Sequence, residues 1–213
     1  MLAPATAPSP SLRFGFGRHP RELTACPPVL ASAMVDPRVP ERLRWAVQLL
    51  DVSPDDEILE IGPGPGVSVS LICEQLVGGR ITIIERSATA VQRATRRNAD
   101  HVASGRAVFH HLDLAEVDLV RRALTGQHFD KALAVNINLF WVRPASAELQ
   151  LIEDLLGPNG VLHLVYEAPG EEQASRVAKA VTAALADRGF ATAVTTASSP
   201  SLMCIAGRPT HDA

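Results

Sequence analysis

The chain has 213 residues, of which 46% are hydrophobic and 20% charged, and its net charge is −3. This length suits one domain with a sizeable core, and no apolar run reaches the roughly 20 residues that span a bilayer. The slightly acidic balance argues against nucleic acid as the main partner, because phosphate binding needs a basic surface.

The first 50 residues show no alternation of strands and helices. Residues 1–10 are rich in Ala, Pro and Ser and lack the basic and apolar regions of a signal peptide, so we expect residues 1–12 to be a disordered tail. Pro37 and Pro40 interrupt a helical pattern, and residues 41–50 are typical of a short amphipathic helix. We expect residues 13–50 to form a lid on the domain that follows, residues 51–213.

From residue 51 onward, strand patterns alternate with helix patterns. The last two strand patterns are separated by five residues, a connection too short for parallel neighbours. The alternation predicts a doubly wound α/β domain with a mostly parallel sheet, helices on both faces and a C-terminal antiparallel hairpin. The predicted strands are 57–61, 80–84, 106–110, 129–135, 161–166, 191–196 and 202–207, and the predicted helices are 67–77, 88–103, 144–156 and 171–188.

Three features follow the first three strands, where ligands of such sheets bind. Glycines at 62, 64 and 66 permit a sharp turn and leave room for a ligand to approach. Glu85 ends the second strand, and a carboxylate there can accept hydrogen bonds from both hydroxyls of a ribose. Asp113 follows the third strand and suits an adenine amino group. A solvated strand-end acid and a turn aspartate are the alternatives for these two residues.

The run I-L-E-I-G-P-G-P-G at residues 58–66 resembles motif I of the class I S-adenosylmethionine-dependent methyltransferases, an acid followed by G-x-G-x-G. The resemblance extends to Glu85, to H-L-D-L at 111–114, to F-D at 129–130 and to L-G-P-N-G-V at 156–161, and it covers roughly residues 40–207. It implies a seven-stranded sheet whose last strand is antiparallel, and S-adenosylmethionine as cofactor. The cofactor-binding residues that it implies are Glu60, Gly62, Gly64, Gly66, Glu85, Asp113, Leu114 and Asn136.

The segment after the fourth strand departs from the family pattern. It reads N-I-N-L-F-W at residues 136–141, where many members have an acid or Asn-Pro-Pro followed by an aromatic residue. This argues against bases of nucleic acids and protein amides as acceptors and favours a small molecule. His111 and Tyr166, both at strand ends, are the candidate catalytic bases, although a strand-end histidine is often structural. The candidate acceptor pocket comprises Phe16, His19, Asn138, Trp141 and Tyr166.

The sequence therefore predicts a methyltransferase that acts on a small molecule, with the methylated atom undetermined. Two alternatives remain: a catalytically silent S-adenosylmethionine-binding protein, and an NAD(P)-dependent oxidoreductase. The second is disfavoured because the glycine spacing differs and no Tyr-x-x-x-Lys pair is present. Three cysteines far apart show no disulfide framework or metal-ligand spacing, which suits a cytoplasmic protein without a metal. The Arg-rich and Ala-rich composition favours a bacterial source, and a homodimer stays open.

Overall fold

The computed structural model describes residues 39–199 and 201–210. The predicted tail, most of the predicted lid, and the pocket candidates Phe16 and His19 lie outside these residues. The strands are β1 (Glu57–Ile61), β2 (Arg80–Glu85), β3 (Ala107–His111), β4 (Phe129–Val135), β5 (Leu156–Glu167), β6 (Phe190–Thr196) and β7 (Leu202–Pro209). The helices are α1 (Glu41–Leu50), α2 (Val67–Cys73), α3 (Ala88–Arg97), α4 (Ala99–Ala103), α5 (Val117–Ala123), α6 (Leu139–Val142), α7 (Ser146–Leu155) and α8 (Glu171–Ala186).

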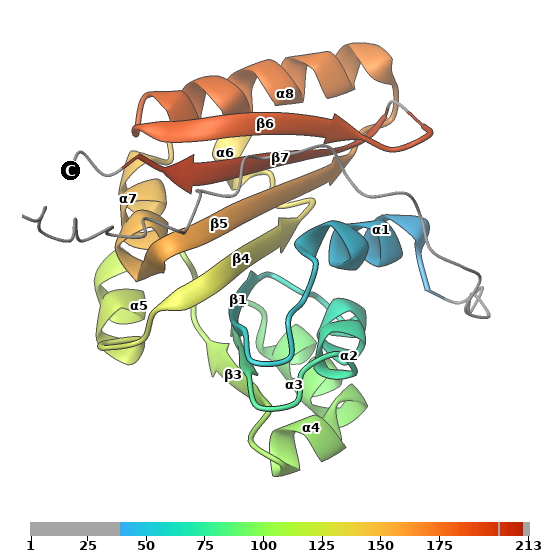
Figure 1. The fold of residues 1–213 in the computed structure, drawn as a ribbon, viewed down its shortest axis with the longest axis vertical. Helices are drawn as coiled ribbons and strands as arrows, with labels where there is room; N and C mark the ends of the chain where they lie inside the picture. The colour runs from blue at the N-terminus through green and yellow to red at the C-terminus, as the bar shows by residue number, and fades with distance from the viewer. Residues whose placement is uncertain (1–38, 200, 211–213) are drawn as a thin grey trace, which may run out of the picture.

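The strands form one seven-stranded sheet in the order β3-β2-β1-β4-β5-β7-β6, which can be followed in Figure 1 from the bottom to the top. β1 to β5 are parallel, β7 runs antiparallel to β5, and β6 runs antiparallel to β7. The predicted fold class is therefore confirmed, including the antiparallel C-terminal hairpin.

Alternation along the strands divides the core into two layers. In β1, Ile58 packs with buried residues of α1 and α2, whereas Leu59 and Ile61 pack with those of α5 to α8. Side chains of successive strand residues point to opposite faces of a sheet. Both faces are therefore covered by helices, and a buried parallel sheet of this kind requires strands that are apolar on both sides.

Several elements differ in extent from the sequence prediction. The predicted helix 88–103 is divided at Asn98 into α3 and α4, and β5 begins at Leu156, earlier than predicted, because Leu156 pairs with Phe129 across a register shift. The short helices α5 and α6 were not predicted. They span seven and four residues, too few for a helical repeat of apolar positions to be recognised.

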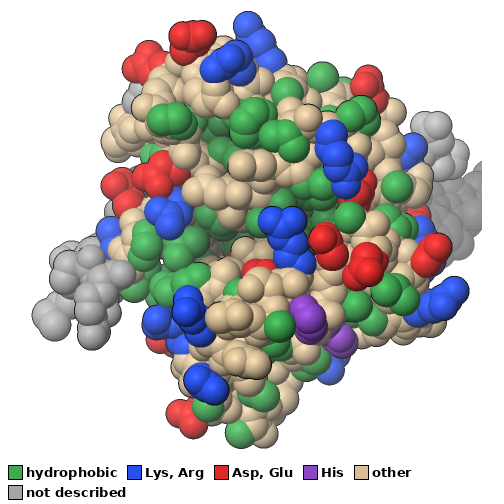
Figure 2. Space-filling model, turned by 180° about the vertical axis from the view of Figure 1, so that it is seen from behind, with side chains coloured by type: hydrophobic (Ala, Val, Ile, Leu, Met, Phe, Trp, Pro, Cys, Tyr) green, Lys and Arg blue, Asp and Glu red, His purple; other side chains and the backbone are tan. Residues whose placement is uncertain are grey.

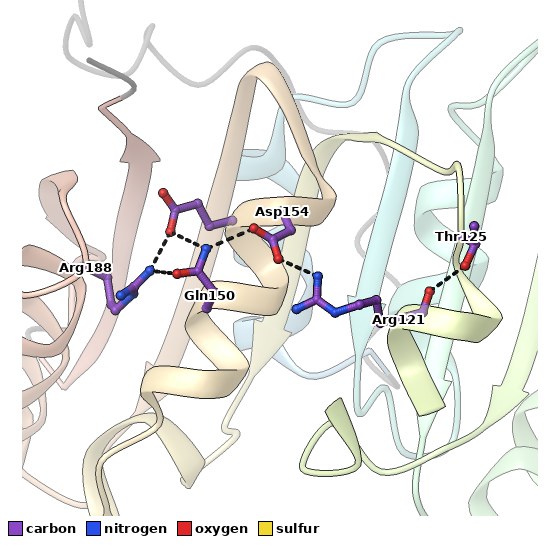
Figure 3. A network of polar contacts seen from close by, with 6 residues as sticks. Arg121, Thr125, Gln150, Asp154 and Arg188 are labelled. Carbon is purple, nitrogen blue, oxygen red and sulfur yellow. Dashed lines mark hydrogen bonds and ion pairs between the residues drawn. The ribbon is translucent and has the colours of Figure 1, made fainter. Parts of the chain in front are cut away.

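A network of polar contacts joins α5, α7 and Arg188, the second residue after the end of α8 (Figure 3). Arg121 pairs with Asp154 at 2.6 Å, and Gln150 donates to the same carboxylate at 2.9 Å. Arg188 contacts Gln150 and donates to Glu153 at 3.1 Å. The Arg121–Asp154 pair is exposed and therefore contributes little to stability, whereas the contacts of Arg188 are partly buried. The network links α5, α7 and the segment after α8 on the face away from α1 and α2.

The described part of the chain shows neither a membrane-spanning helix nor a metal cluster. None of the helices found there is long and apolar enough to cross a membrane. Within the same residues, no group of three or more His, Cys, Asp or Glu side chains is arranged to hold a metal ion. Cys73 and Cys204 are buried free thiols, and Cys26 lies outside the described residues.

Candidate functional site

The candidate site lies where the strand order reverses. The chain continues from β1 to β2 on one side, and β4 lies on the other side of β1. The carboxyl ends of these three strands therefore bring the glycine loop (residues 62–66), Glu85 and the segment 136–138 to one edge of the sheet. A reversal of this kind forms the ligand-binding crevice in open α/β sheets.

The glycine loop has backbone angles that favour glycine. Gly62, Gly64 and Gly66 have φ values of +66°, +57° and +75°, in the region that side chains rarely adopt. A Cβ at Gly62 would lie 2.5 Å from the Ile137 Cδ1, whereas a Cβ at Gly64 would meet no protein atom within 4 Å. The open side of the loop is therefore at Gly64, and a ligand can approach the backbone there.

Glu85 is held against this loop. Its side chain is buried, and the residue is only 7% exposed. Its Oε2 accepts a hydrogen bond from the Gly64 N–H at 3.2 Å, and its Oε1 accepts one from the Ser87 N–H at 2.8 Å. Each carboxylate oxygen has a second lone pair. Two vicinal hydroxyls could therefore donate to an acceptor whose position is fixed in advance, which fits the ribose of the expected cofactor.

Glu60 lies deeper, one residue before the end of β1, and is only 1% exposed. In the sheet register it is flanked by Ile83 and Leu133. Its Oε1 accepts a hydrogen bond from the Ser68 hydroxyl, while its Oε2 has no hydrogen-bond partner among the described residues. Burial raises the pKa of Glu60 to about 7, although the Ser68 hydrogen bond acts in the opposite direction. An unpartnered buried carboxyl oxygen beside the loop fits an ammonium group.

The residues at the end of β3 make local contacts. Asp113 Oδ1 accepts a hydrogen bond from the Ala115 N–H at 3.0 Å, in a turn that leaves its other oxygen available. Leu114 is buried in the core. His111 Nε2 lies 3.0 Å from the carbonyl oxygen of Arg86. A carbonyl can only accept, so we assign the proton to Nε2, which leaves Nδ1 as an acceptor.

The β4–α6 loop is fastened to β5 by two side chains that the sequence singled out. Asn136 has a φ of +55°, and its Oδ1 accepts a hydrogen bond from the Glu167 N–H at 2.8 Å. The Tyr166 hydroxyl donates to the carbonyl oxygen of Ile137 at 3.0 Å, and burial raises the pKa of this phenol above its usual range. Both contacts fix the loop at the carboxyl edge of the sheet.

The structure separates the two candidate bases. His111 ends β3 and Tyr166 lies near the end of β5, four strands away in the sheet order. At the usual strand spacing this corresponds to about 19 Å. His111 and Tyr166 therefore cannot act on the same proton.

The remaining pocket candidates lie on α6 and just before it. Asn138 Oδ1 accepts a hydrogen bond from the Trp141 indole N–H at 3.3 Å. Trp141 also lines a cavity of about 370 Å³ between the α6–α7 segment and α8. None of the residues predicted to bind the cofactor lines that cavity. Trp141 therefore contacts the loop after β4 through its indole N–H and also lines the cavity beside α8.

The glycine loop is also held by two residues at the end of α3 that the sequence did not indicate. Arg97 Nε donates to the carbonyl oxygen of Pro65 at 3.0 Å, and Asn98 Nδ2 donates to that of Gly66 at 3.0 Å. Both residues lie in the predicted helix 88–103, and no local pattern distinguishes them from the other polar residues there. Both contacts span 32 residues of sequence, so only the fold reveals them.

Alanine at Gly64 and alanine at Gly66 should have different consequences. A positive φ costs either variant about 1–2 kcal/mol, but at Gly66 the methyl group would also lie 2.7 Å from the Ala94 Cβ. We expect Gly66→Ala to lower the free energy of unfolding by about 1 kcal/mol more than Gly64→Ala does. Gly64→Ala should instead impair binding of S-adenosylhomocysteine, because its methyl group enters the open space.

Urea denaturation and calorimetric titration measure these two effects separately. Equal losses of stability would contradict the steric argument. Unchanged binding by Gly64→Ala would show that a ligand does not approach the loop from its open side.

Comparisons with known proteins agree with this geometry. Residues 58–160 match the model of a family described as a methyltransferase domain. The chain is 33% identical over 86 residues to a probable ribosomal RNA small subunit methyltransferase A of Methanospirillum hungatei, covering 40% of this chain and 31% of that protein. It is 40% identical over 55 residues to a protein-L-isoaspartate O-methyltransferase of Salinibacter ruber, covering 26% and 23%. These matches span less than a third of either curated relative.

Solved structures share the fold at low sequence identity. The mitomycin 7-O-methyltransferase MmcR superposes with a TM-score of 0.61 at 15% identity, over 79% of this chain and 54% of that one. A precorrin-6y C5,15-methyltransferase from Geobacter metallireducens superposes with a TM-score of 0.61 at 17% identity, over 84% and 94%.

Proposed function

The chain belongs to the class I S-adenosylmethionine-dependent methyltransferases, and from that premise we propose that it transfers the methyl group of this cofactor to a small molecule. The observation that carries the proposal is the arrangement of Gly64, Glu85 and Glu60 at one reversal of strand order. It combines an open glycine backbone, a buried carboxylate held in place, and a buried carboxyl oxygen that has no partner among the described residues.

Each part of this arrangement has a proposed role. Glu85 accepts hydrogen bonds from the ribose hydroxyls, and Gly62, Gly64 and Gly66 form the backbone surface against the methionine and ribose portion. Glu60 faces the ammonium group. The free carboxylate oxygen of Asp113 accepts from the adenine amino group. Leu114 and Asn136 complete the proposed cofactor contacts.

The cofactor supplies a methyl group on a sulfonium, which an acceptor displaces in line. Such a reaction depends strongly on alignment of the reacting atoms, so the proposed work of the protein is to fix the loop and the acceptor. Tyr166 suits a positioning role, because its hydroxyl already donates to Ile137 and its raised pKa disfavours ionisation. His111 lies four strands from Tyr166, about 19 Å away, so it is too far to act as the base for an acceptor bound beside Tyr166.

A small-molecule acceptor is supported by charge and by the fold relatives. On the face shown in Figure 2, Lys and Arg side chains are interspersed with Asp and Glu side chains, which is unlike a continuous basic surface for phosphates. The two superposed structures are a mitomycin 7-O-methyltransferase and a precorrin-6y C5,15-methyltransferase, and both names specify small-molecule substrates. A cytoplasmic location, a bacterial source and assembly as a homodimer remain part of this proposal.

The proposed lid is supported by the position of α1. In Figure 1, α1 lies beside the carboxyl ends of β4 and β5, and Arg42 of α1 pairs with Glu167 at 3.0 Å. The first turn of α1 therefore lies at the ligand edge of the sheet. We propose that residues 13–50 cover the acceptor there, with Phe16, His19, Asn138, Trp141 and Tyr166 contributing to the pocket.

The proposal is tested by binding and turnover together. Calorimetric titration should show micromolar binding of S-adenosylmethionine and no binding of NADH. Incubation with methyl-labelled S-adenosylmethionine and a library of small acceptors should then release S-adenosylhomocysteine and a labelled product. Binding without turnover on any acceptor class would favour a catalytically silent binding protein. Failure to bind S-adenosylmethionine would refute the proposal.

A further inference from the structure

The glycine loop is gripped by two side chains on the side of α3, which we call the α3 clamp: Arg97 and Asn98. Arg97 holds the carbonyl oxygen of Pro65, and Asn98 holds that of Gly66. These are the last two residues of the loop before α2 begins. Neither contact belongs to the hydrogen-bond ladder of the sheet, because Pro65 and Gly66 lie beyond the end of β1.

Fixing these carbonyl oxygens fixes the peptide groups that follow them. A trans peptide is planar, and its C=O and N–H point in opposite directions. When Arg97 and Asn98 hold the oxygens toward α3, the N–H groups of Gly66 and Val67 must point away from α3. The Gly66 N–H does so and donates to the carbonyl oxygen of Pro63 at 3.2 Å, closing the turn.

Asn98 is itself fully committed to this geometry. It is 1% exposed, and its Nδ2 donates both to Gly66 and, at 2.9 Å, to the carbonyl oxygen of Ala94. Its Oδ1 accepts from the Ser70 hydroxyl at 2.7 Å. A Cβ at Gly66 would lie 2.8 Å from the Asn98 Nδ2, so loop and amide are in close contact. Asn98 lies at the junction between α3 and α4.

We propose that Arg97 and Asn98 are positioning residues for the cofactor, which hold the glycine loop in its binding conformation and act only through that loop. The inference rests on the proposed function of the loop as the S-adenosylmethionine site. It predicts that loss of either contact lets the loop adopt other conformations. Cofactor binding then weakens, because a protein whose binding conformation is only partly populated has a reduced apparent affinity.

Arg97 allows a matched test, because Nε of arginine and Nε2 of glutamine are attached to the same side-chain position. Arg97→Gln keeps an N–H donor near Pro65 and removes the charge, whereas Arg97→Met keeps the length and removes the donor. Arg96→Met is the control, since Arg96 is exposed on the same helix. We expect Arg97→Met to bind S-adenosylhomocysteine about fivefold more weakly, and the other two variants to bind like the parent.

Hydrogen exchange of the free protein supplies a second readout. Arg97→Met should speed exchange at the amides of Gly62, Gly64, Gly66 and Val67 and leave exchange in the sheet unchanged. Asn98→Asp, which lacks the Nδ2 donors, should weaken binding at least tenfold and release the same amides. If the parent fails to bind S-adenosylhomocysteine, the proposed function fails. If the parent binds and Arg97→Met behaves like Arg96→Met in both readouts, the α3 clamp has no positioning role.

Discussion

Glu85→Ala is expected to weaken binding of S-adenosylmethionine about a hundredfold while leaving the protein folded. The carboxylate accepts N–H bonds from Gly64 and Ser87 and presents its remaining lone pairs at the ligand edge. Hydrogen bonds to a charged acceptor contribute about 1.5–3 kcal/mol each, and about 2.7 kcal/mol corresponds to a hundredfold change in Kd. The substitution also removes the acceptor of the Gly64 N–H, so the backbone at Gly64 is no longer held in place.

Calorimetric titration of both proteins measures this loss. Glu57→Ala is a suitable control, because Glu57 begins β1 at the opposite edge of the sheet and forms an exposed ion pair with Arg80. Glu57→Ala should leave the Kd for S-adenosylmethionine unchanged. It should change the free energy of unfolding by no more than about 1 kcal/mol. Parent-like affinity in Glu85→Ala would contradict the ribose role and leave Glu85 as a structural acceptor for two backbone groups.

The parts of the site that the sequence predicted are those governed by local chemistry. The glycine positions follow from backbone angles that other residues avoid, and β1 and β4 have the predicted bounds because buried strands are uninterrupted apolar runs. Glu85 was identified because it is an acidic residue at the carboxyl end of a predicted strand, where ligands of such sheets bind. In each case the prediction depends only on a few residues that are neighbours in the sequence.

The parts that the sequence did not predict depend on contacts between distant segments. Asn98 resembles any polar helix residue until the fold places it against Gly66. The separation of His111 from Tyr166 follows from strand order, which reverses at β1 and cannot be read from either residue's neighbours. That Glu60 Oε2 has no partner within residues 39–199 and 201–210 likewise depends on the packing of Glu60 between Ile83 and Leu133.

Glu60→Gln is expected to remove a pH-dependent loss of stability from the cofactor-free protein. The pKa of Glu60 is raised from 4.5 to about 7 by burial. Between these values the unfolded chain has lost a proton that the folded protein keeps, so stability falls as pH rises from about 4.5 to 7 and then levels off. A shift of this size corresponds to about 3 kcal/mol. Glutamine has nearly the same shape and stays neutral, so the variant should gain relative stability across this window.

The difference between parent and variant isolates Glu60 from other titrations. Burial lowers the pKa of His163 to about 4, which makes stability rise between about pH 4 and 6.5 in both proteins and cancels in the difference. Urea denaturation from pH 5 to 8 measures the two curves. Parallel curves would contradict a buried, protonated Glu60.

The same carboxyl group should couple cofactor binding to proton release. An ammonium group beside Oε2 favours the ionised carboxylate, so below pH 7 the parent should release a proton on binding S-adenosylhomocysteine. Titration at pH 6 in two buffers of different ionisation enthalpy should give different apparent enthalpies for the parent and equal ones for Glu60→Gln. Equal enthalpies in the parent would mean that Glu60 does not change its charge on binding. The unpartnered oxygen would then have a structural explanation that does not involve the cofactor.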